Sequence, residues 1–109
     1  MAARPSAGAL MIEVSVGPDL VTVTLGGDLD VTMAAPLRAQ LARVVAARPG
    51  RLVFDLAQVG FIDCACARLI AGAGRSLPAG RRPAIHSASP MVRRVLDLSG
   101  LAALCEISG

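Results

Sequence analysis

Residues 51–72, RLVFDLAQVGFIDCACARLIAG, decide the fold of this chain. Residues 51–56 form a short apolar run of the kind found in buried strands. We expect a loop at 57–60 and then the segment Phe61-Ile62-Asp63, where Asp63 is a preferred N-cap for a helix. Residues 64–77 carry apolar side chains at helical spacing. The stretch therefore predicts a buried strand, a short loop and a helix.

Two segments upstream alternate apolar and polar residues, as half-buried strands do. They are residues 11–16 (MIEVSV) and 20–25 (LVTVTL), with the turn residues GPD between them. This arrangement predicts an antiparallel hairpin at the start of the domain. We expect residues 26–30 (GGDLD) to end the second strand.

Further helices and strands alternate along the rest of the chain. Thr32 is the expected N-cap of a helix that ends before Pro49 and buries Met33, Leu37, Leu41 and Val44. The pattern after residue 77 predicts a strand at 84–87, a helix from 89 to 98 and a strand at 104–107.

The resulting order, ββαβαβαβ, predicts one α/β domain with a mixed β-sheet, an N-terminal β-hairpin and helices packed on the sheet. A chain of 109 residues has room for one such domain. We expect a flexible N-terminal tail at 1–9 and the domain at 10–109.

The composition excludes several classes of protein. With 54% hydrophobic and 17% charged residues, the chain is not intrinsically disordered. The net charge of +3 comes from eleven scattered arginines and eight acids, without the dense basic stripe typical of nucleic-acid binding. No apolar run is long enough to span a membrane, and residues 1–10 do not look like a secretory signal. We therefore expect a cytoplasmic protein that does not bind nucleic acid directly.

No catalytic or cofactor-binding pattern stands out. His86 is the only histidine and has no nucleophile or carboxylate at the spacing of a catalytic triad. Cys64, Cys66 and Cys105 are the only cysteines, and C-x-C is not the C-x-x-C of thioredoxin-like proteins. The spacing of these four residues does not match a zinc module, so we assign no metal site. Two interpretations of the cysteines stay open: small core residues or a redox role.

Four segments together resemble the STAS domain, the fold of bacterial anti-sigma factor antagonists. GDLD at 27–30 is similar to the motif that follows the second strand of the family. LVFDL and VGFID at 52–63 are similar to its central strand and the segment after it. SPMVRRVL and DLSGL at 89–101 are similar to its last conserved helix and the exit from it. The resemblance extends over residues 10–107.

This resemblance implies a regulatory binding protein that is not an enzyme and needs no cofactor. In the family, an anti-sigma factor of the histidine-kinase-like ATPase type phosphorylates a serine directly after F-I-D. The unphosphorylated antagonist binds that kinase and makes it release a sigma factor. Here Cys64 occupies the position of the phosphoacceptor serine. The partner-binding residues implied by the resemblance are Asp28, Asp30, Phe61, Asp63, Cys64 and Ala65.

Other roles of this domain stay open. STAS domains also serve as small subunits of membrane lipid transporters and as scaffolds in stress-signalling complexes. A helix N-terminus favours a thiolate and the adjacent Asp63 opposes it, so a redox switch at Cys64, Cys66 or Cys105 is a separate hypothesis. A homodimer is also left open.

Overall fold

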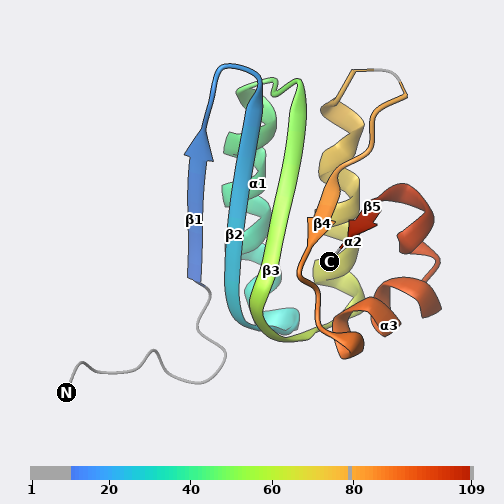
Figure 1. Ribbon diagram of the computed structural model, residues 1–109. Helices are drawn as coiled ribbons and strands as arrows, with labels where there is room; N and C mark the ends of the chain where they lie inside the picture. The colour runs from blue at the N-terminus through green and yellow to red at the C-terminus, as the bar shows by residue number, and fades with distance from the viewer. Residues whose placement is uncertain (1–10, 79, 109) are drawn as a thin grey trace.

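A five-stranded sheet organises the computed structural model, which describes residues 11–78 and 80–108 (Figure 1). The strands lie in chain order, and β1 pairs antiparallel with β2 while every other neighbouring pair is parallel. Their bounds are β1 Met11–Val16, β2 Leu20–Leu29, β3 Arg51–Ile62, β4 Ala84–His86 and β5 Glu106–Ser108. The predicted hairpin, mixed sheet and element order are confirmed. The expected tail at 1–9 lies outside the described residues.

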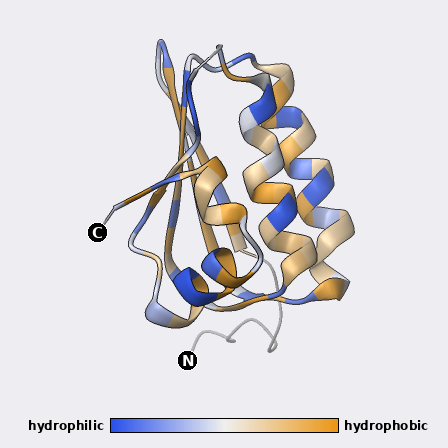
Figure 2. Cartoon of the chain, turned by 90° about the vertical axis from the view of Figure 1, so that its right-hand side faces the viewer, coloured by the Kyte–Doolittle hydropathy of each residue, from blue (hydrophilic) through white to orange (hydrophobic). Residues whose placement is uncertain are grey.

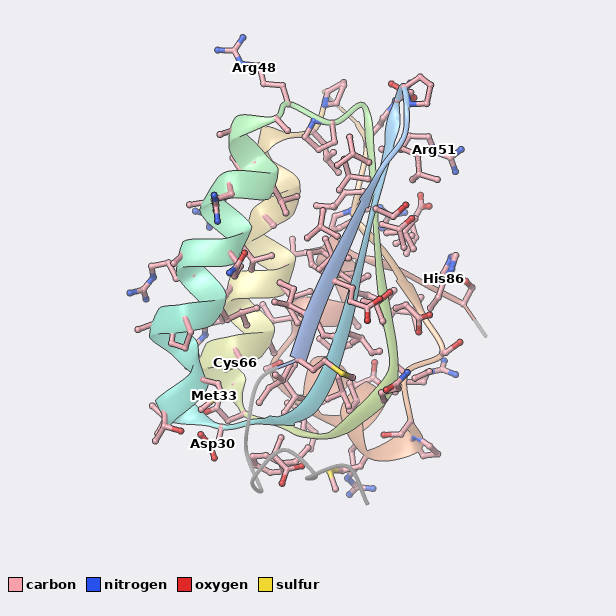
Figure 3. The ribbon with its side chains drawn as sticks, turned by 90° about the vertical axis from the view of Figure 1, so that its left-hand side faces the viewer. Asp30, Met33, Arg48, Arg51, Cys66 and His86 are labelled. Atoms are coloured by element: carbon pink, nitrogen blue, oxygen red, sulfur yellow. The ribbon has the colours of Figure 1, made fainter. Side chains whose placement is uncertain are left out.

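Helices α1 and α2 pack side by side on one face of the sheet (Figures 1 and 2). Short 3₁₀ helices precede α1, extend α2 and follow α3. The bounds are η1 Val31–Met33, α1 Ala34–Ala46, α2 Cys64–Gly72, η2 Ala73–Ser76, α3 Pro90–Leu98 and η3 Leu101–Leu104. No helix of the described residues covers the opposite face of the sheet. Figure 3 shows Arg51 and His86 on that face.

The core lies between the sheet and its helices. Alternate residues of β2 and β3 point toward α1 and α2, as the period-2 pattern predicts. Phe54, at the centre of β3, is completely buried. Other buried side chains of this layer include Val21, Val23, Leu25, Leu52, Leu56, Leu37, Leu41, Val44 and Ile70. Aliphatic burial of this kind is the main stabilising contribution to the fold.

The prediction that residues 26–30 end the second strand is wrong, because β2 continues to Leu29. Two register shifts, at Thr24/Gly26 and Gly27/Asp28, let β2 stay paired with β3. Gly27 has a φ of 92°, which glycine adopts without strain. A Cβ on Gly26 would lie 2.6 Å from Met11 Cε. Gly27 therefore permits a bulge at which the strand continues and does not end.

The loop expected at 57–60 is also part of a strand. β3 runs without interruption to Ile62, and Val59 pairs with Gly27 and is buried. The extension of β2 gives this part of β3 a hydrogen-bonding partner. Backbone pairing therefore overrides the weak strand pattern of the sequence AQVG.

Smaller corrections concern the ends of elements. Thr32 is not an N-cap. Asp30 caps η1, where its carboxylate accepts a hydrogen bond from the Thr32 backbone N–H, and α1 follows η1 with Met33 in its N-cap position and no side-chain capping bond. β4 ends at His86, because Ser87 adopts a φ of 61°. The final strand is 106–108 and not 104–107, since η3 occupies residues 101–104.

The two phenylalanines provide a matched test of the core. Phe54→Ala should lower the free energy of unfolding by about 3–5 kcal/mol, because it leaves a cavity in a fully buried layer. Phe61→Ala, at a side chain that is 40% exposed, should cost less than about 1.5 kcal/mol. Urea unfolding followed by circular dichroism measures both losses. Equal losses in the two variants would contradict this assignment of the core.

Candidate functional site

The ends of β2 and β3 bring together two segments that are 33 residues apart in the sequence, around Asp30 and Asp63. Leu29 and Ile62 are register partners at the carboxyl ends of the two strands. The Asp63 backbone N–H donates to the Leu29 carbonyl at 3.0 Å. Since the strands are parallel, the helices that follow both start at this edge of the sheet, where α/β proteins commonly bind ligands and partners.

Asp30 and Asp63 both hold the start of a helical segment. Asp30 Oδ1 accepts from the Thr32 N–H at 2.9 Å and also from the Thr32 hydroxyl. Asp63 Oδ1 accepts from the Cys66 N–H at 2.8 Å, which confirms the predicted N-cap of α2. Carboxylates in this position satisfy unpaired N–H groups and interact favourably with the helix dipole. These two residues therefore position the surrounding surface.

Cys66 links the two helix starts through a buried thiol. Its Sγ donates to the Asp30 carbonyl at 3.3 Å, and Figure 3 shows both residues at the same end of the molecule. Burial raises the pKa of the Cys66 thiol from 9.0 to about 12, and the charges of Asp63 and Asp30 add to the effect. The thiol therefore keeps its proton at neutral pH and remains a hydrogen-bond donor.

The side chains available to a partner lie beside these caps. Phe61 is 40% exposed, Cys64 is exposed, and Ala65 is half-buried. Asp28 is the register partner of Phe61, and its carboxylate lies over Gly60, where an added Cβ would be 3.1 Å from Oδ1. The structure thus brings the six predicted binding residues to one edge of the sheet. We call the set Asp28, Val31, Phe61, Cys64 and Ala65 the β2–β3 edge surface.

Val31 is a member of this surface that the sequence interpretation missed. It follows the cap Asp30 directly, as Cys64 follows the cap Asp63, and it is 67% exposed. The sequence could have indicated Val31 by its position: it follows the aspartate after the second strand, just as Cys64 follows the aspartate after the third.

The other candidate residues do not converge on this edge. Cys105 is buried, and burial raises the pKa of its thiol. His86 is exposed on β4, on the face of the sheet away from α1 and α2 (Figure 3). All three cysteines are free thiols, and residues 11–78 and 80–108 contain no cluster of three or more histidine, cysteine or acidic residues that would hold a metal ion. Cys64 is the exposed thiol, so a redox role at this residue stays a prediction.

Within the part of the chain that the structure describes, no helix has both the length and the hydropathy needed to cross a membrane.

The fold and this edge define a STAS domain. The family model described as "Mlab, STAS domain" matches residues 12–106, and the chain belongs to this family. A relative is the anti-sigma-F factor antagonist RsfB of Mycobacterium tuberculosis, which is 28% identical over 95 residues. That alignment covers 77% of this chain and 78% of RsfB.

Solved structures show the same fold. The crystal structure of an anti-sigma factor antagonist from Mycobacterium paratuberculosis superposes with a TM-score of 0.81 at 24% identity, over 92% of this chain and 86% of that one. The unphosphorylated form of the anti-sigma factor antagonist SpoIIAA superposes with a TM-score of 0.73 at 25% identity, over 93% of this chain and 89% of that one. The predicted family and fold class are therefore confirmed.

The raised pKa of Cys66 predicts a loss of stability in alkali. Below pH 9, Cys66 is protonated in both the folded and the unfolded chain. Between pH 9 and 12 the unfolded chain loses this proton while the folded chain keeps it, so folding stability falls by at most about 1.4 kcal/mol per pH unit. The chain contains neither lysine nor tyrosine, so few other groups titrate in this range.

Urea unfolding between pH 8 and 11 measures this loss, with Cys66→Ala as the control. The difference in unfolding free energy between wild type and Cys66→Ala should shrink as the pH rises, because only the wild type carries the titrating thiol. A difference that stays constant over the range would contradict the raised pKa.

Proposed function

We propose that this chain is an anti-sigma factor antagonist that binds its partner through the β2–β3 edge surface. The observation that carries the proposal is its similarity to RsfB along most of both chains. An antagonist of this kind acts by occupying the anti-sigma factor, which frees a sigma factor for transcription. It performs no catalysis, needs no cofactor and works in the cytoplasm without contacting nucleic acid.

The proposed partner is an anti-sigma factor of the histidine-kinase-like ATPase type. Phe61 and Val31 supply exposed apolar area, and aromatic side chains near the centre of an interface commonly carry much of its binding energy. Asp28 adds a negative charge beside Phe61. Asp30 and Asp63 contribute by fixing the helix starts from which Val31 and Cys64 project. Ala65 leaves the start of α2 without a bulky side chain that would hinder docking.

We propose further that this antagonist is not switched by serine phosphorylation. Cys64 occupies the position after F-I-D, where the family carries its phosphoacceptor, and Ala65 follows without a hydroxyl group. The thiol of Cys64 is exposed to an approaching partner. Without a serine hydroxyl at this position the surface stays permanently unphosphorylated, which is the form that binds in the family.

A pull-down with the tagged chain tests the class of partner. Recovery of a histidine-kinase-like ATPase supports the proposal, and that protein then becomes the probe for the two predictions below. Recovery of an ATP-binding cassette subunit would instead support the second candidate, a STAS subunit of a lipid transporter. A permanent transporter subunit needs no phosphorylation switch, so the lack of a hydroxyl side chain at residues 63–67 agrees with this second candidate.

Negative charge at position 64 should weaken partner binding. Cys64→Asp should bind the recovered ATPase at least about tenfold less tightly, a loss of about 1.4 kcal/mol, because the new carboxylate is desolvated beside Asp63. Cys64→Asn is the matched control, with nearly the same shape and no charge, and should lose much less. Isothermal titration calorimetry measures both affinities. Equal affinities of wild type and Cys64→Asp would place the interface elsewhere.

The wild-type chain should take up no phosphate at residues 63–67 when it is incubated with the ATPase and ATP, since this segment contains no hydroxyl side chain. Mass spectrometry of the peptides measures the modification. Cys64→Ser restores a hydroxyl in the same structural position and is the control for kinase activity. Phosphate on the wild-type segment would overturn the proposal of an unswitched antagonist.

A further inference from the structure

β1 is the outermost strand on one side of the sheet, and its outer backbone groups have no neighbouring strand among the described residues. It is the first strand in the sheet order, and among the described residues it pairs only with β2. Its residues Ile12, Val14 and Val16 share the helix-side face, because they are partners of buried residues of β2. Val14 is nevertheless 43% exposed and Val16 is 70% exposed. Two valines on the core side of the sheet are thus left without a covering helix.

A hollow next to β1 continues this apolar surface. It has a volume of about 240 Å³ and lies between β1 and α1. Val14, Val16 and Val21 line it from the sheet, and Val44 lines it from α1, with Gln40, Arg43 and Ala47 at the helix side. Figure 3 looks onto this edge of the molecule, with β1 in front and α1 beside it.

Apart from the single charge of Glu13, β1 lacks the features that keep edge strands from pairing. Proteins usually protect such strands with lysine, proline, bulges or inward-pointing charges. β1 contains none of these residue types, its pairing with β2 is regular along all six residues, and its only charge is Glu13 on the outer face. An unprotected strand with exposed backbone groups and an apolar face is suited to accept another strand.

We propose that the strand that pairs with β1 is β1 of a second copy of this chain. Antiparallel pairing about a two-fold axis with Val14 opposite Val14 of the other copy places Ile12 opposite Val16 and Glu13 opposite Ser15. Every pair then joins side chains of similar polarity, and no like charges face each other. A shift of the pairing by one residue would place the apolar side chains of one copy on the same face as the polar side chains of the other. A shift of two residues toward the N-terminus would place Glu13 opposite Glu13.

This self-complementarity favours a second copy over a foreign strand. In the paired arrangement the sheet continues across both copies, with both α1 helices on the same face and the two hollows joined above Val14. Two six-residue strands bury less than the roughly 800 Å² per partner of a standard interface. We therefore expect a dimer that dissociates on dilution.

The dimer and the proposed partner site use different surfaces. β1 pairs with β2 only as far as Gly26, whereas Asp28, Phe61 and Cys64 lie beyond that point. The failure of one proposal therefore leaves the other intact, since the oligomeric state is measured on the isolated chain and needs no anti-sigma factor.

Single cysteines on β1 test the register in the full chain. In a Cys64→Ser background the two remaining native thiols are buried. Val14→Cys should be joined efficiently to a second copy by a short thiol–thiol cross-linker, because position 14 faces itself. Val16→Cys, which faces position 12, should react much less. Equal cross-linking of the two variants, or none in either, would overturn the proposed pairing.

Light scattering after size-exclusion chromatography provides a second, independent readout. Wild type should change from dimer to monomer on dilution, and Val14→Lys should be monomeric at every concentration, because two charges would face each other across the axis. Ser15→Lys is the matched control, since it faces Glu13 of the other copy and should keep the dimer. A monomeric wild type at high concentration, or a dimeric Val14→Lys that remains folded by circular dichroism, would refute the proposal.

Discussion

The parallel pairing of β2 with β3 is the constraint on which the rest of the structure depends. It continues past two register shifts at Gly26 and Gly27, so that Leu29 and Ile62 end the two strands side by side. Asp30 and Asp63 then start η1 and α2 at the same edge. Had β2 ended at residue 25, the second half of β3 would have no partner for its backbone groups, and the two helix starts would not be brought together. The continuation of β2 past residue 25 is thus a condition for the site.

The Cys64-x-Cys66 motif shows how about half a turn of helix gives two thiols different roles. Cys64 is exposed on the β2–β3 edge surface. Cys66 is buried and donates to the Asp30 carbonyl, and its pKa is raised to about 12. A protonated, buried thiol behaves as a small core residue with a weak donor. The same two-residue spacing therefore supplies one side chain to the surface and one to the junction beneath it.

Much of this structure follows from local sequence patterns. The hairpin, the three α-helices, the cap Asp63 and the buried residues Leu37, Leu41 and Val44 agree with the patterns of alternation, helical spacing and capping. These features are predictable because they depend on residues close together in the chain. The six candidate binding residues were also brought to one edge, which follows from the parallel connection of consecutive strands.

The sequence by itself determined the α/β class and the family, because each of these depends only on residue types and their spacing. The tertiary structure alone decided that residues 26–29 and 57–62 are strand, since each segment is weak by itself and is held by the other. It also decided that Val31 belongs to the edge surface, that Cys66 is buried and Cys64 exposed, and that Val14 and Val16 lack a cover. Burial is a property of what packs against a residue, and that neighbour comes from a distant part of the chain.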